Sequence, residues 1–352
     1  MDVIPSAWHR KRVLVTGHTG FKGSWLVLLL NELGAEVIGL SLPPPTTGHS
    51  LFRDARIQSL VSDEFIVDIR DEEKVNSAIQ SSNIDYAFHL AAQALVNKSI
   101  KNPLESITTN VLGTTNVLLS LFKLESLQGV SVVTSDKVYK NSGKGKPFSE
   151  SDRLGSKDPY SASKAAVELI TNSLSLTCNP IKIPVTTVRA GNVLGGGYWG
   201  EDRLVPDLVK AVMSNQILQV RNPNAIRPWQ HVLDCLTGYL LVGQSHLNKN
   251  IDTPASINFG SSESLSVIEL IRIFELSFRK KINYKIIEPN NYESVWLELD
   301  SKLAKDYLGW QTSFSSIDAI NQTADWYSKF ANGTDPKELM QQEILSYRTG
   351  KW

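Results

Sequence analysis

The chain of 352 residues predicts an α/β fold with a doubly wound parallel sheet and a smaller C-terminal lobe. Short apolar runs alternate with helical stretches through the first half of the chain. This rhythm is typical of a parallel sheet covered by helices on both faces. Glycine-rich and polar motifs directly follow several of the apolar runs. Because ligands bind at the carboxyl ends of the strands in such sheets, the motifs predict one common site.

The apolar runs predict the strands of this sheet. Each run is short, rich in β-branched residues and bounded by glycine, proline or a polar residue, which is the signal of a buried strand. The first run leads into a glycine turn, and the third ends at Asp68. The predicted strands are Arg12–Thr16, Glu36–Leu42, Phe65–Val67, Tyr86–Leu90, Val130–Thr134 and Pro184–Arg189.

Helices are predicted between the strands. The first stops at Gly34, a residue type that favours helix ends. After Arg189 the alternation breaks into glycine-rich loops and short segments, where we expect the smaller lobe. A helix at Leu233–Gln244 and a strand at Ile257–Gly260 are expected to return to the first lobe. The predicted helices of the first half are Ser24–Leu33, Glu72–Gln80, Pro103–Lys123 and Pro159–Thr177.

The run Gly17–Gly23, with the sequence GHTGFKG, lies between the first strand and the first helix. Strand, glycine turn and helix in this order form the context of a dinucleotide fingerprint, although the spacing is GxxGxxG rather than GxGxxG. The glycines let the backbone approach a pyrophosphate, whose charge then lies at a helix N-terminus. We therefore predict a Rossmann-type nucleotide-binding domain over residues 1–190, completed by about 229–260. Residues 191–228 and 261–352 would form the substrate lobe.

Tyr160 and Lys164 lie four residues apart in a predicted helix, so a phenol and an ammonium would share one face. A nearby cation lowers the pKa of a tyrosine, and such a tyrosine can accept a proton from a substrate alcohol near neutral pH. Ser135 follows the fifth strand at the same edge of the predicted sheet. The alternative is an ordinary surface helix, but the glycine turn and Ser135 favour a catalytic site.

The composition excludes several classes of function. Lysine plus arginine and aspartate plus glutamate number 36 each, so no overall charge attracts nucleic acid or an acidic membrane. No apolar stretch is long enough to span a bilayer or to act as a signal peptide. Cys178 and Cys235 cannot by themselves form a disulfide framework or a metal cluster. We expect a cytoplasmic enzyme without a metal, a nucleic-acid partner or a membrane segment.

Together these motifs resemble the extended short-chain dehydrogenase/reductase family, from about Arg12 to about Trp310. The family's TGxxGFxG motif is present at Thr16–Gly23, and its YxxxK pair is Tyr160 and Lys164. Longer runs resemble the nucleotide-sugar epimerase/dehydratase branch, and within it the dehydratases of CDP-glucose. These runs are Gly17–Trp25, Thr134–Lys137, Arg189–Gly197, Glu201–Asp207 and Arg221–His231.

The resemblance implies a lyase reaction on a nucleotide-linked hexose. The C4 hydroxyl is oxidised with NAD as hydride acceptor, water leaves from C5 and C6, and the hydride returns to C6. Tyr160 would be the C4 base, Lys164 would tune it and hold the nicotinamide ribose, and Ser135 would position the C4 hydroxyl. Asp136 and Lys137 would be the acid and base of the elimination, with a surface ion pair as their alternative. The dTDP-glucose branch carries Asp-Glu at these two positions.

The resemblance also implies the binding residues, with NAD as the cofactor and a CDP-hexose as the substrate. Guanidinium groups match phosphate in a bidentate fashion, which favours arginines for the diphosphate. For Arg221 a structural hydrogen bond is an equal alternative. The implied substrate contacts are Gln93, Asn192, Arg203, Arg221 and Arg227. The implied cofactor contacts are Gly17, Gly20, Phe21, Lys22, Gly23, Asp68, Ile69, Ala91, Ala92, Gln93, Tyr160 and Lys164.

Three stretches depart from the family pattern. One is Asn291-Tyr292-Glu293, outside the residues that the structure describes, which lacks the histidine-rich run often found there in the family. The second strand ends in Ser41-Leu42-Pro43, without the acidic residue that usually binds the adenosine ribose of NAD. The choice of NAD over NADP therefore depends on the resemblance and on Asp68. Tyr198 stands where the family carries an aspartate after three glycines.

The resemblance further implies a homodimer, or a tetramer that contains such dimers. In this family the helices that correspond to Pro103–Lys123 and Pro159–Thr177 pair across a two-fold axis, and the first of them is rich in apolar residues. The product would serve deoxysugar biosynthesis for surface polysaccharide. The rival functions are a nucleotide-sugar 4,6-dehydratase with another base, a 4-epimerase and a non-catalytic NAD-binding protein.

Overall fold

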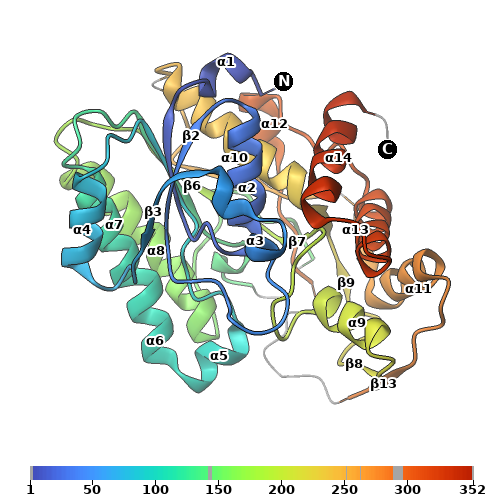
Figure 1. Ribbon diagram of the computed structural model, residues 1–352. Coiled ribbons are helices and arrows are strands. Elements are labelled where there is room, and N and C mark those ends of the chain that lie inside the picture. The colour runs from blue at the N-terminus through green and yellow to red at the C-terminus, as the bar shows by residue number, and fades with distance from the viewer. Residues whose placement is uncertain (1–2, 142–144, 251, 262, 288–295, 351–352) are drawn as a thin grey trace.

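The computed structural model of the protein describes residues 3–141, 145–250, 252–261, 263–287 and 296–350. A seven-stranded parallel sheet, in the order β11-β6-β5-β4-β1-β2-β3, forms its centre (Figure 1). This sheet confirms the predicted α/β fold class. Its strands are β1 (Arg12–Thr16), β2 (Glu36–Ser41), β3 (Val61–Ile66), β4 (Tyr86–His89), β5 (Gly129–Val133), β6 (Val185–Ala190) and β11 (Ser256–Phe259).

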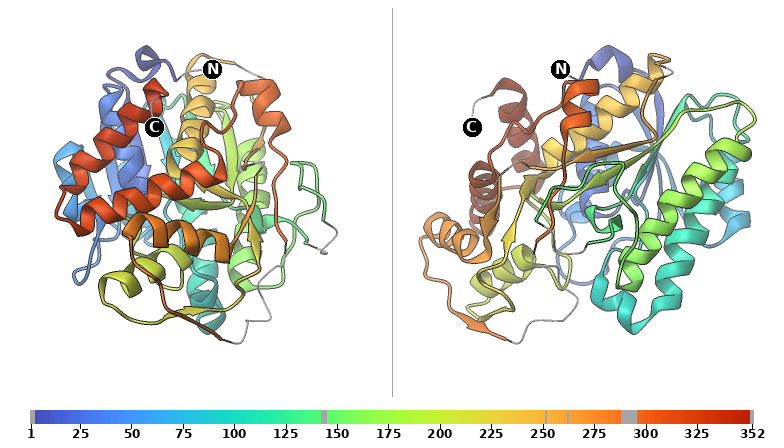
Figure 2. Two further views of the ribbon diagram at one scale, coloured as in Figure 1. Left: turned by 90° about the vertical axis from the view of Figure 1, so that its right-hand side faces the viewer. Right: turned by 180° about the vertical axis from the view of Figure 1, so that it is seen from behind.

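Helices cover both faces of the sheet (Figures 1 and 2). Side chains of β1 alternate between the faces, because successive strand residues point to opposite sides. Leu14 belongs to an apolar cluster with α4, α7 and α8, whereas Val13 and Val15 belong to the cluster with α2 and α10. Burial on both sides explains why the central strands consist of continuous apolar runs. These helices are α2 (Phe21–Glu32), α4 (Glu72–Gln80), α7 (Gly113–Leu121), α8 (Pro159–Thr177) and α10 (Val232–Leu247).

Helix α8 has the predicted bounds, and its first turn explains why. The side chain of Asp158 accepts hydrogen bonds from the backbone nitrogen of Ser161 at 3.0 Å and from its hydroxyl at 2.6 Å. Pro159 occupies the first helical position, where the missing N–H is no loss. This cap starts the helix at a defined residue and thereby sets which face carries Tyr160 and Lys164.

The third strand differs from its prediction. β3 spans Val61–Ile66 rather than Phe65–Val67, so the pattern found only its end. β3 is the edge strand of the sheet and pairs with β2 alone. Its middle residues, Ser62-Asp63-Glu64, are polar, so its first half lacks the apolar run by which a buried strand is recognised.

The predicted helix Pro103–Lys123 is interrupted. Helix α6 (Pro103–Ile107) is followed by a π-turn at Thr108–Leu112, and α7 continues from Gly113. A π-turn inserts one extra residue into a helix and occurs often at functional sites. Apolar periodicity tolerates such an insertion, so the sequence pattern did not reveal it.

Beyond β6 the chain leaves the sheet and returns to it. Helix α10 packs on β5 and α2, and β11 pairs with β6, as predicted for the returning helix and strand. Around them lie three two-stranded sheets, β7–β10, β9–β12 and β8–β13. The lobe boundaries near residues 190, 229 and 260 stay a prediction. The small strands are β7 (Asn192–Leu194), β8 (Leu218–Val220), β9 (Ile226–Arg227), β10 (Trp229–His231), β12 (Leu265–Ser266) and β13 (Tyr284–Ile286).

Further helices complete the described structure. Helices α9 and α11 lie next to the small sheets, at the lower right of Figure 1. Among the described residues, no helix has the length and apolar character needed to cross a membrane. The remaining helices are α1 (Pro5–Trp8), α3 (Leu51–Asp54), α5 (Val96–Lys101), α9 (Leu204–Met213), α11 (Val267–Phe278), α12 (Lys302–Leu308), α13 (Ser316–Ala331) and α14 (Pro336–Thr349).

Candidate active site

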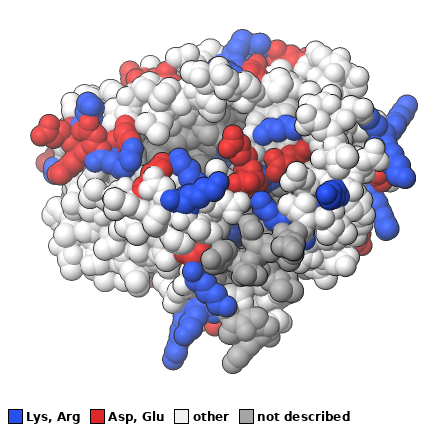
Figure 3. Space-filling view, turned by 90° about the horizontal axis from the view of Figure 1, so that it is seen from below, with Lys and Arg blue, Asp and Glu red and all other residues white. Residues whose placement is uncertain are grey.

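A cavity of about 1660 Å³ opens at the carboxyl ends of the strands, between the sheet and the small sheets that follow β6. Binding pockets for one small ligand usually measure ~300–1,000 Å³, so this volume suits two ligands side by side. Every residue that the sequence assigned to the site lines this cavity. Figure 3 views the molecule from below, where lysine and arginine side chains lie beside acidic ones around a hollow.

The glycine turn can hold a diphosphate because side chains would not fit there. Gly17 has a φ of +74°, and a Cβ on it would lie 2.9 Å from the backbone nitrogen of Ala91. A Cβ on Gly23 would come within 2.2 Å of the carbonyl oxygen of Gly17. Gly20 caps α2, whose N-terminus faces the cavity and favours negative charge. The residues of this turn therefore fit the pyrophosphate of a dinucleotide.

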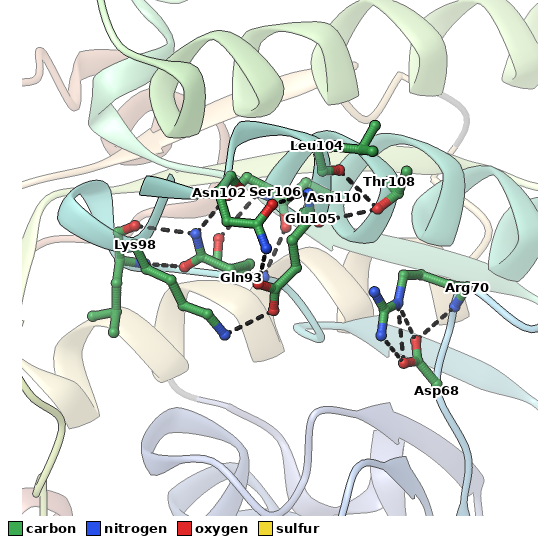
Figure 4. Close-up of polar contacts among 11 residues, drawn as sticks. Asp68, Arg70, Gln93, Lys98, Asn102, Leu104, Glu105, Ser106, Thr108 and Asn110 are labelled. Carbon is green, nitrogen blue, oxygen red and sulfur yellow. Dashed lines mark hydrogen bonds and ion pairs between the residues drawn. The ribbon is translucent and has the colours of Figure 1, made fainter. Parts of the chain in front are cut away.

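The end of the cavity that the sequence predicted for the adenosine is built from residues after β2 and β3 and from the glycine turn. Asp68 follows β3 by two residues and accepts hydrogen bonds from the backbone nitrogen and Nε of Arg70 (Figure 4). These contacts hold the pKa of Asp68 below its usual range, so the carboxylate is ionised. At the end of β2, the hydroxyl groups of Ser41 and Thr19 lie 2.9 Å apart. The hydroxyl groups of Ser41 and Thr19 thus lie at the end of β2, where NAD-binding folds of this type usually carry an acidic residue.

The segment after β5 brings three predicted catalytic residues to the cavity wall. Ser135 caps a short turn at Asp136–Val138, and its hydroxyl donates to Oδ1 of Asp136 at 2.9 Å. Asp136 is 5% exposed, and burial raises the pKa of its carboxyl. The charges of Lys137, Lys22 and Arg227 and the bond from Ser135 oppose this rise. Burial therefore shifts Asp136 toward its protonated form, the form that a general acid needs.

Tyr160 and Lys164 lie one turn apart on α8, and both are buried. Burial raises the pKa of Tyr160, and the main groups that lower it are Arg203 and the Ser135 hydroxyl. Lys164 instead donates to the carbonyl oxygen of Val133 at 2.9 Å. The groups that act most on the Tyr160 pKa thus do not include Lys164, whose ammonium points to the end of β5, and the expectation that Lys164 lowers the tyrosine pKa stays a prediction. Burial, with the charge of Lys22, lowers the pKa of Lys164 to about 8.

A buried network supports these residues from behind. Arg189 on β6 forms a two-point ion pair with Glu168 on α8, and the two side chains are 4% and 3% exposed. The hydroxyl of Thr134 donates to Glu168, and Arg189 donates to the hydroxyl of Tyr139 at 2.6 Å. Thr134 precedes Ser135, and Tyr139 follows the 136–138 turn. The ion pair therefore ties both ends of the catalytic segment to α8 and β6.

Gln93 lines the cavity, but its amide is already occupied (Figure 4). Its Nε2 donates to the hydroxyl of Ser106 at 2.6 Å and to the carbonyl oxygen of Leu95 at 3.1 Å. The predicted contact of this amide with cofactor or sugar therefore competes with internal bonds. Asn110, in the π-turn, accepts from the backbone nitrogen of Gln93 and donates to the hydroxyl of Ser163 on α8.

The three arginines predicted for the diphosphate come from the small sheets and α9. Arg203, before α9, donates to the carbonyl oxygen of Ala94 at 2.7 Å, while its buried Nε has no hydrogen-bond partner. Arg227, on β9, lowers the pKa of Asp136. Arg221 forms an ion pair with Asp202 at 3.6 Å, which agrees with the structural role named as one of two alternatives for this arginine. The phosphate contact of Arg221 stays a prediction. Asn192, on β7, reaches the same cavity.

Several cavity and support residues were not singled out as site residues from the sequence. Tyr198, noted only as a departure, stacks on Phe21 with ring centres 4.7 Å apart. Asn110 and Glu168 carry no motif of their own. For Arg189 the sequence does indicate a buried ion pair, because an arginine at the end of an apolar strand needs a buried partner. This indication does not identify the partner, which lies 21 residues away in sequence.

Comparison with known proteins identifies the family. The family model described as GDP-mannose 4,6 dehydratase matches residues 14–323. A CDP-glucose 4,6-dehydratase of Salmonella typhimurium is 37% identical over 349 residues, which cover 97% of each chain. The chain belongs to the nucleotide-sugar dehydratase/epimerase family. UDP-glucose 4-epimerases of the same family are more distant, such as that of Neisseria meningitidis serogroup C, which is 27% identical over 92% of this chain and 99% of its own.

Solved structures share the fold of this family member. A dTDP-glucose 4,6-dehydratase from Streptomyces venezuelae, with NAD bound, superposes with a TM-score of 0.78 at 24% identity, over 93% of this chain and 99% of that one. A UDP-glucose 4-epimerase from Stenotrophomonas maltophila, also with NAD bound, gives a TM-score of 0.79 at 24% identity, over 92% and 100%. Both dehydratases and epimerases therefore use this arrangement of sheet and small lobe.

The buried ammonium of Lys164 predicts a pH-dependent stability. Between its folded pKa of about 8 and the ordinary value near 10.5, the unfolded chain binds a proton that the folded chain has lost. Stability of the wild type should therefore rise with pH in this window relative to Lys164→Met. We expect a relative gain of roughly 2 kcal/mol between about pH 7.5 and 9.5, measured by urea unfolding.

Lys123→Met is the matched control, because Lys123 is exposed. The difference in free energy of unfolding between Lys123→Met and wild type should stay constant over the same pH window. A constant difference for Lys164→Met as well would mean that the folded protein keeps the Lys164 ammonium charged throughout.

Proposed function

We propose that the protein is an NAD-dependent dehydratase that converts CDP-D-glucose to CDP-4-keto-6-deoxy-D-glucose. The observation that carries the proposal is the buried Asp136 next to Lys137, beside Ser135 and Tyr160 on one cavity wall. A dehydration needs this second acid/base pair in addition to the tyrosine that serves oxidation. The 37% identity to a CDP-glucose 4,6-dehydratase supports the choice of nucleotide.

The cofactor of this proposal is NAD, which fits the glycine turn and the Asp68 end of the cavity. When bound, it accepts a hydride from C4 and returns it to C6. Gly17 and Gly23 admit the pyrophosphate to the N-terminus of α2. Relatives of known structure bind NAD in their versions of this fold.

The protein's own groups divide the proton transfers among separate side chains. Tyr160 takes the proton of the C4 hydroxyl, which the Ser135 hydroxyl positions. Oxidation at C4 acidifies the C5 proton, and Lys137 takes it. Asp136 gives its proton to the C6 oxygen as the C6–O bond breaks, so that water leaves. Lys164 holds the nicotinamide ribose, and its low pKa reflects the burial that this role requires.

The diphosphate of the substrate is assigned to the arginines on the small-lobe side. Arg203 lines the cavity, and its buried Nε has no hydrogen-bond partner within the described residues. Arg227 lies near Asp136, at the sugar end of the same wall. Two guanidinium groups from different elements can clamp two phosphates and align the hexose with Tyr160.

A 4-epimerase is the second candidate, because a UDP-glucose 4-epimerase shares the fold. An epimerase needs no acid for a leaving hydroxyl. The protonated state that burial favours for Asp136 is of use to a dehydratase and has no task in a simple epimerase. This difference supports dehydration over epimerisation.

Incubation with CDP-, dTDP-, UDP- and GDP-glucose tests the proposal. We expect CDP-glucose to yield a product lighter by one water, with catalytic rather than stoichiometric NAD, followed by mass spectrometry. Tyr160→Phe should lower the rate ~10²–10⁴-fold with nucleotide binding retained, because only the ionisable oxygen is lost. Accumulation of NADH would indicate a simple dehydrogenase, and a product of unchanged mass an epimerase.

Lys137→Ala should separate oxidation from elimination. Without the C5 base, C4 oxidation continues, so bound NADH and a 4-keto hexose accumulate and solvent deuterium does not enter C5. Lys146→Ala, an exposed lysine of the following loop, should behave as wild type. Undiminished exchange at C5 in Lys137→Ala would show that another group removes the proton and that Lys137 only pairs with Asp136.

We also propose a homodimer through α6, α7 and α8. These neighbouring helices and the π-turn between α6 and α7 expose large apolar side chains that a monomer would leave in water, namely Leu104, Ile107, Leu112, Leu169 and Leu176. Leu169→Glu should convert the dimer to a monomer in sedimentation. Leu276→Glu is the control, since Leu276 is 79% exposed on α11, away from these helices. A wild-type monomer at all concentrations would contradict this assembly.

A further inference from the structure

The loop between β7 and α9 carries a residue to which the proposed reaction gives no role. Tyr198 is one of the departures from the family pattern, and it is half-buried in the cavity wall. The same loop joins two residues predicted to contact the substrate, Asn192 on β7 and Arg203 directly before α9. Tyr198 can therefore act on substrate binding through the loop, and its contacts show how.

Tyr198 stacks on the first residue of α2. Its ring centre lies 4.7 Å from that of Phe21, with 16° between the two ring planes. Phe21 directly follows Gly20, which caps α2 where a pyrophosphate is expected. A Cβ on Gly195 would lie 3.3 Å from Cζ of Phe21, so the backbone of the loop also packs on this ring. The loop thus contacts the glycine turn directly.

A second contact from the same face of α2 holds the loop. Trp25 lies one turn after Phe21 on the helix, and its Nε1 donates to the carbonyl oxygen of Gly196 at 3.0 Å. From the other side, the hydroxyl of Tyr327 on α13 donates to the carbonyl oxygen of Tyr198 at 2.6 Å. The loop is therefore fixed between α2 and α13.

The far end of the loop is bonded to α9. Nζ of Lys210 donates to the carbonyl oxygen of Trp199 at 3.0 Å, and Lys210 lies about two turns after the start of this helix. Arg203 caps the same helix, and its guanidinium donates to the carbonyl oxygen of Ala94 at 2.7 Å. Contacts therefore run without a break from the predicted pyrophosphate site, through the loop, to an arginine predicted for the substrate diphosphate.

We propose that Tyr198 is a positioning residue that couples the two halves of the cavity, so that NAD and a nucleoside diphosphate strengthen each other's binding. Occupation of the glycine turn restrains Phe21, the stack restrains the loop, and the loop holds Arg203 in place. The first ligand thereby meets part of the ordering cost that the second ligand would otherwise meet. Such coupling is reciprocal, so its factor is the same whichever ligand binds first. The inference deepens the proposed function, on which its choice of CDP rests.

The test measures the coupling ratio, which is the dissociation constant of NAD without CDP divided by that with saturating CDP, by isothermal titration calorimetry. CDP carries the diphosphate but no hexose, so no reaction takes place. In wild type, CDP should tighten NAD binding about fivefold or more. In Tyr198→Ala the ratio should fall toward unity, because one aromatic pair can account for up to about tenfold. Binding of NAD alone and of CDP alone should stay close to wild type.

Two further variants show that the aromatic stack itself carries the effect. Tyr198→Phe keeps the ring without the hydroxyl and should keep the wild-type ratio. Tyr284→Ala is the matched control, because Tyr284 on β13 is 40% exposed and lies outside the cavity lining, and its ratio should also equal that of wild type. If Tyr198→Ala does not fold, Tyr198→Leu replaces it, since leucine keeps an apolar side chain without a ring.

A double-mutant cycle tests whether Phe21 and Tyr198 act as one unit. Phe21→Leu and Tyr198→Leu should each lower the coupling ratio. The double variant should lower it no further than either single change, because each change already removes the stack. Additive losses would show that the two rings act separately and would contradict the proposed route.

Other outcomes overturn the inference. Equal coupling ratios in wild type and Tyr198→Ala would do so, as would a wild type in which CDP leaves NAD binding unchanged. Weaker binding of NAD or CDP alone, with an unchanged ratio, would make Tyr198 a direct ligand contact. Loss of coupling in Tyr198→Phe would assign the effect to the hydroxyl. If wild type binds NAD but not CDP, the proposed substrate is wrong, and dTDP, UDP and GDP then test the coupling independently.

Discussion

The ion pair between Arg189 and Glu168 is the constraint on which the candidate site depends. Both charges are buried, and removal of one partner from such a pair typically costs ~3–5 kcal/mol. Glu168 lies one turn after Lys164 on α8, while Arg189 lies at the end of β6, just before the loop that leads to Asn192. Through Thr134 and Tyr139 the pair also holds both ends of the catalytic segment. One interaction behind the cavity therefore fixes α8, the segment after β5 and the end of β6 relative to one another.

Burial has opposite effects on the acidic and basic groups of the cavity. It raises the pKa of Asp136 and of Tyr160 and lowers that of Lys164, so each group is shifted toward its neutral form. Nearby positive charges lower the pKa values of Asp136 and Tyr160 and so oppose the effect of burial. Arg203 acts on Tyr160, whereas Lys22 and Arg227 act on Asp136. An oxidation that needs a base and an elimination that needs an acid can thus share one cavity without sharing one group.

The glycine turn has both a backbone that suits a pyrophosphate and side chains that contact other parts of the molecule. Its glycines bring the backbone close to the place of a pyrophosphate, which members of this fold share. Its variable positions make other contacts: Phe21 stacks on Tyr198, and Nζ of Lys22 donates to the Tyr239 hydroxyl on α10. A motif that is typical of cofactor binding therefore also contacts the part of the chain that follows β6.

The sequence by itself determined the parallel sheet, the glycine turn, the bounds of α8 and a set of candidate site residues that all line the cavity. These follow from local patterns: apolar runs, glycine spacing, a capping aspartate, and motifs at strand ends that must meet at one edge. Only the tertiary structure decided the π-turn at Thr108–Leu112, the direction of Lys164 and the occupied amide of Gln93. Each depends on which groups the packed chain brings together, since a buried polar atom bonds to its neighbours in space and not to those in sequence.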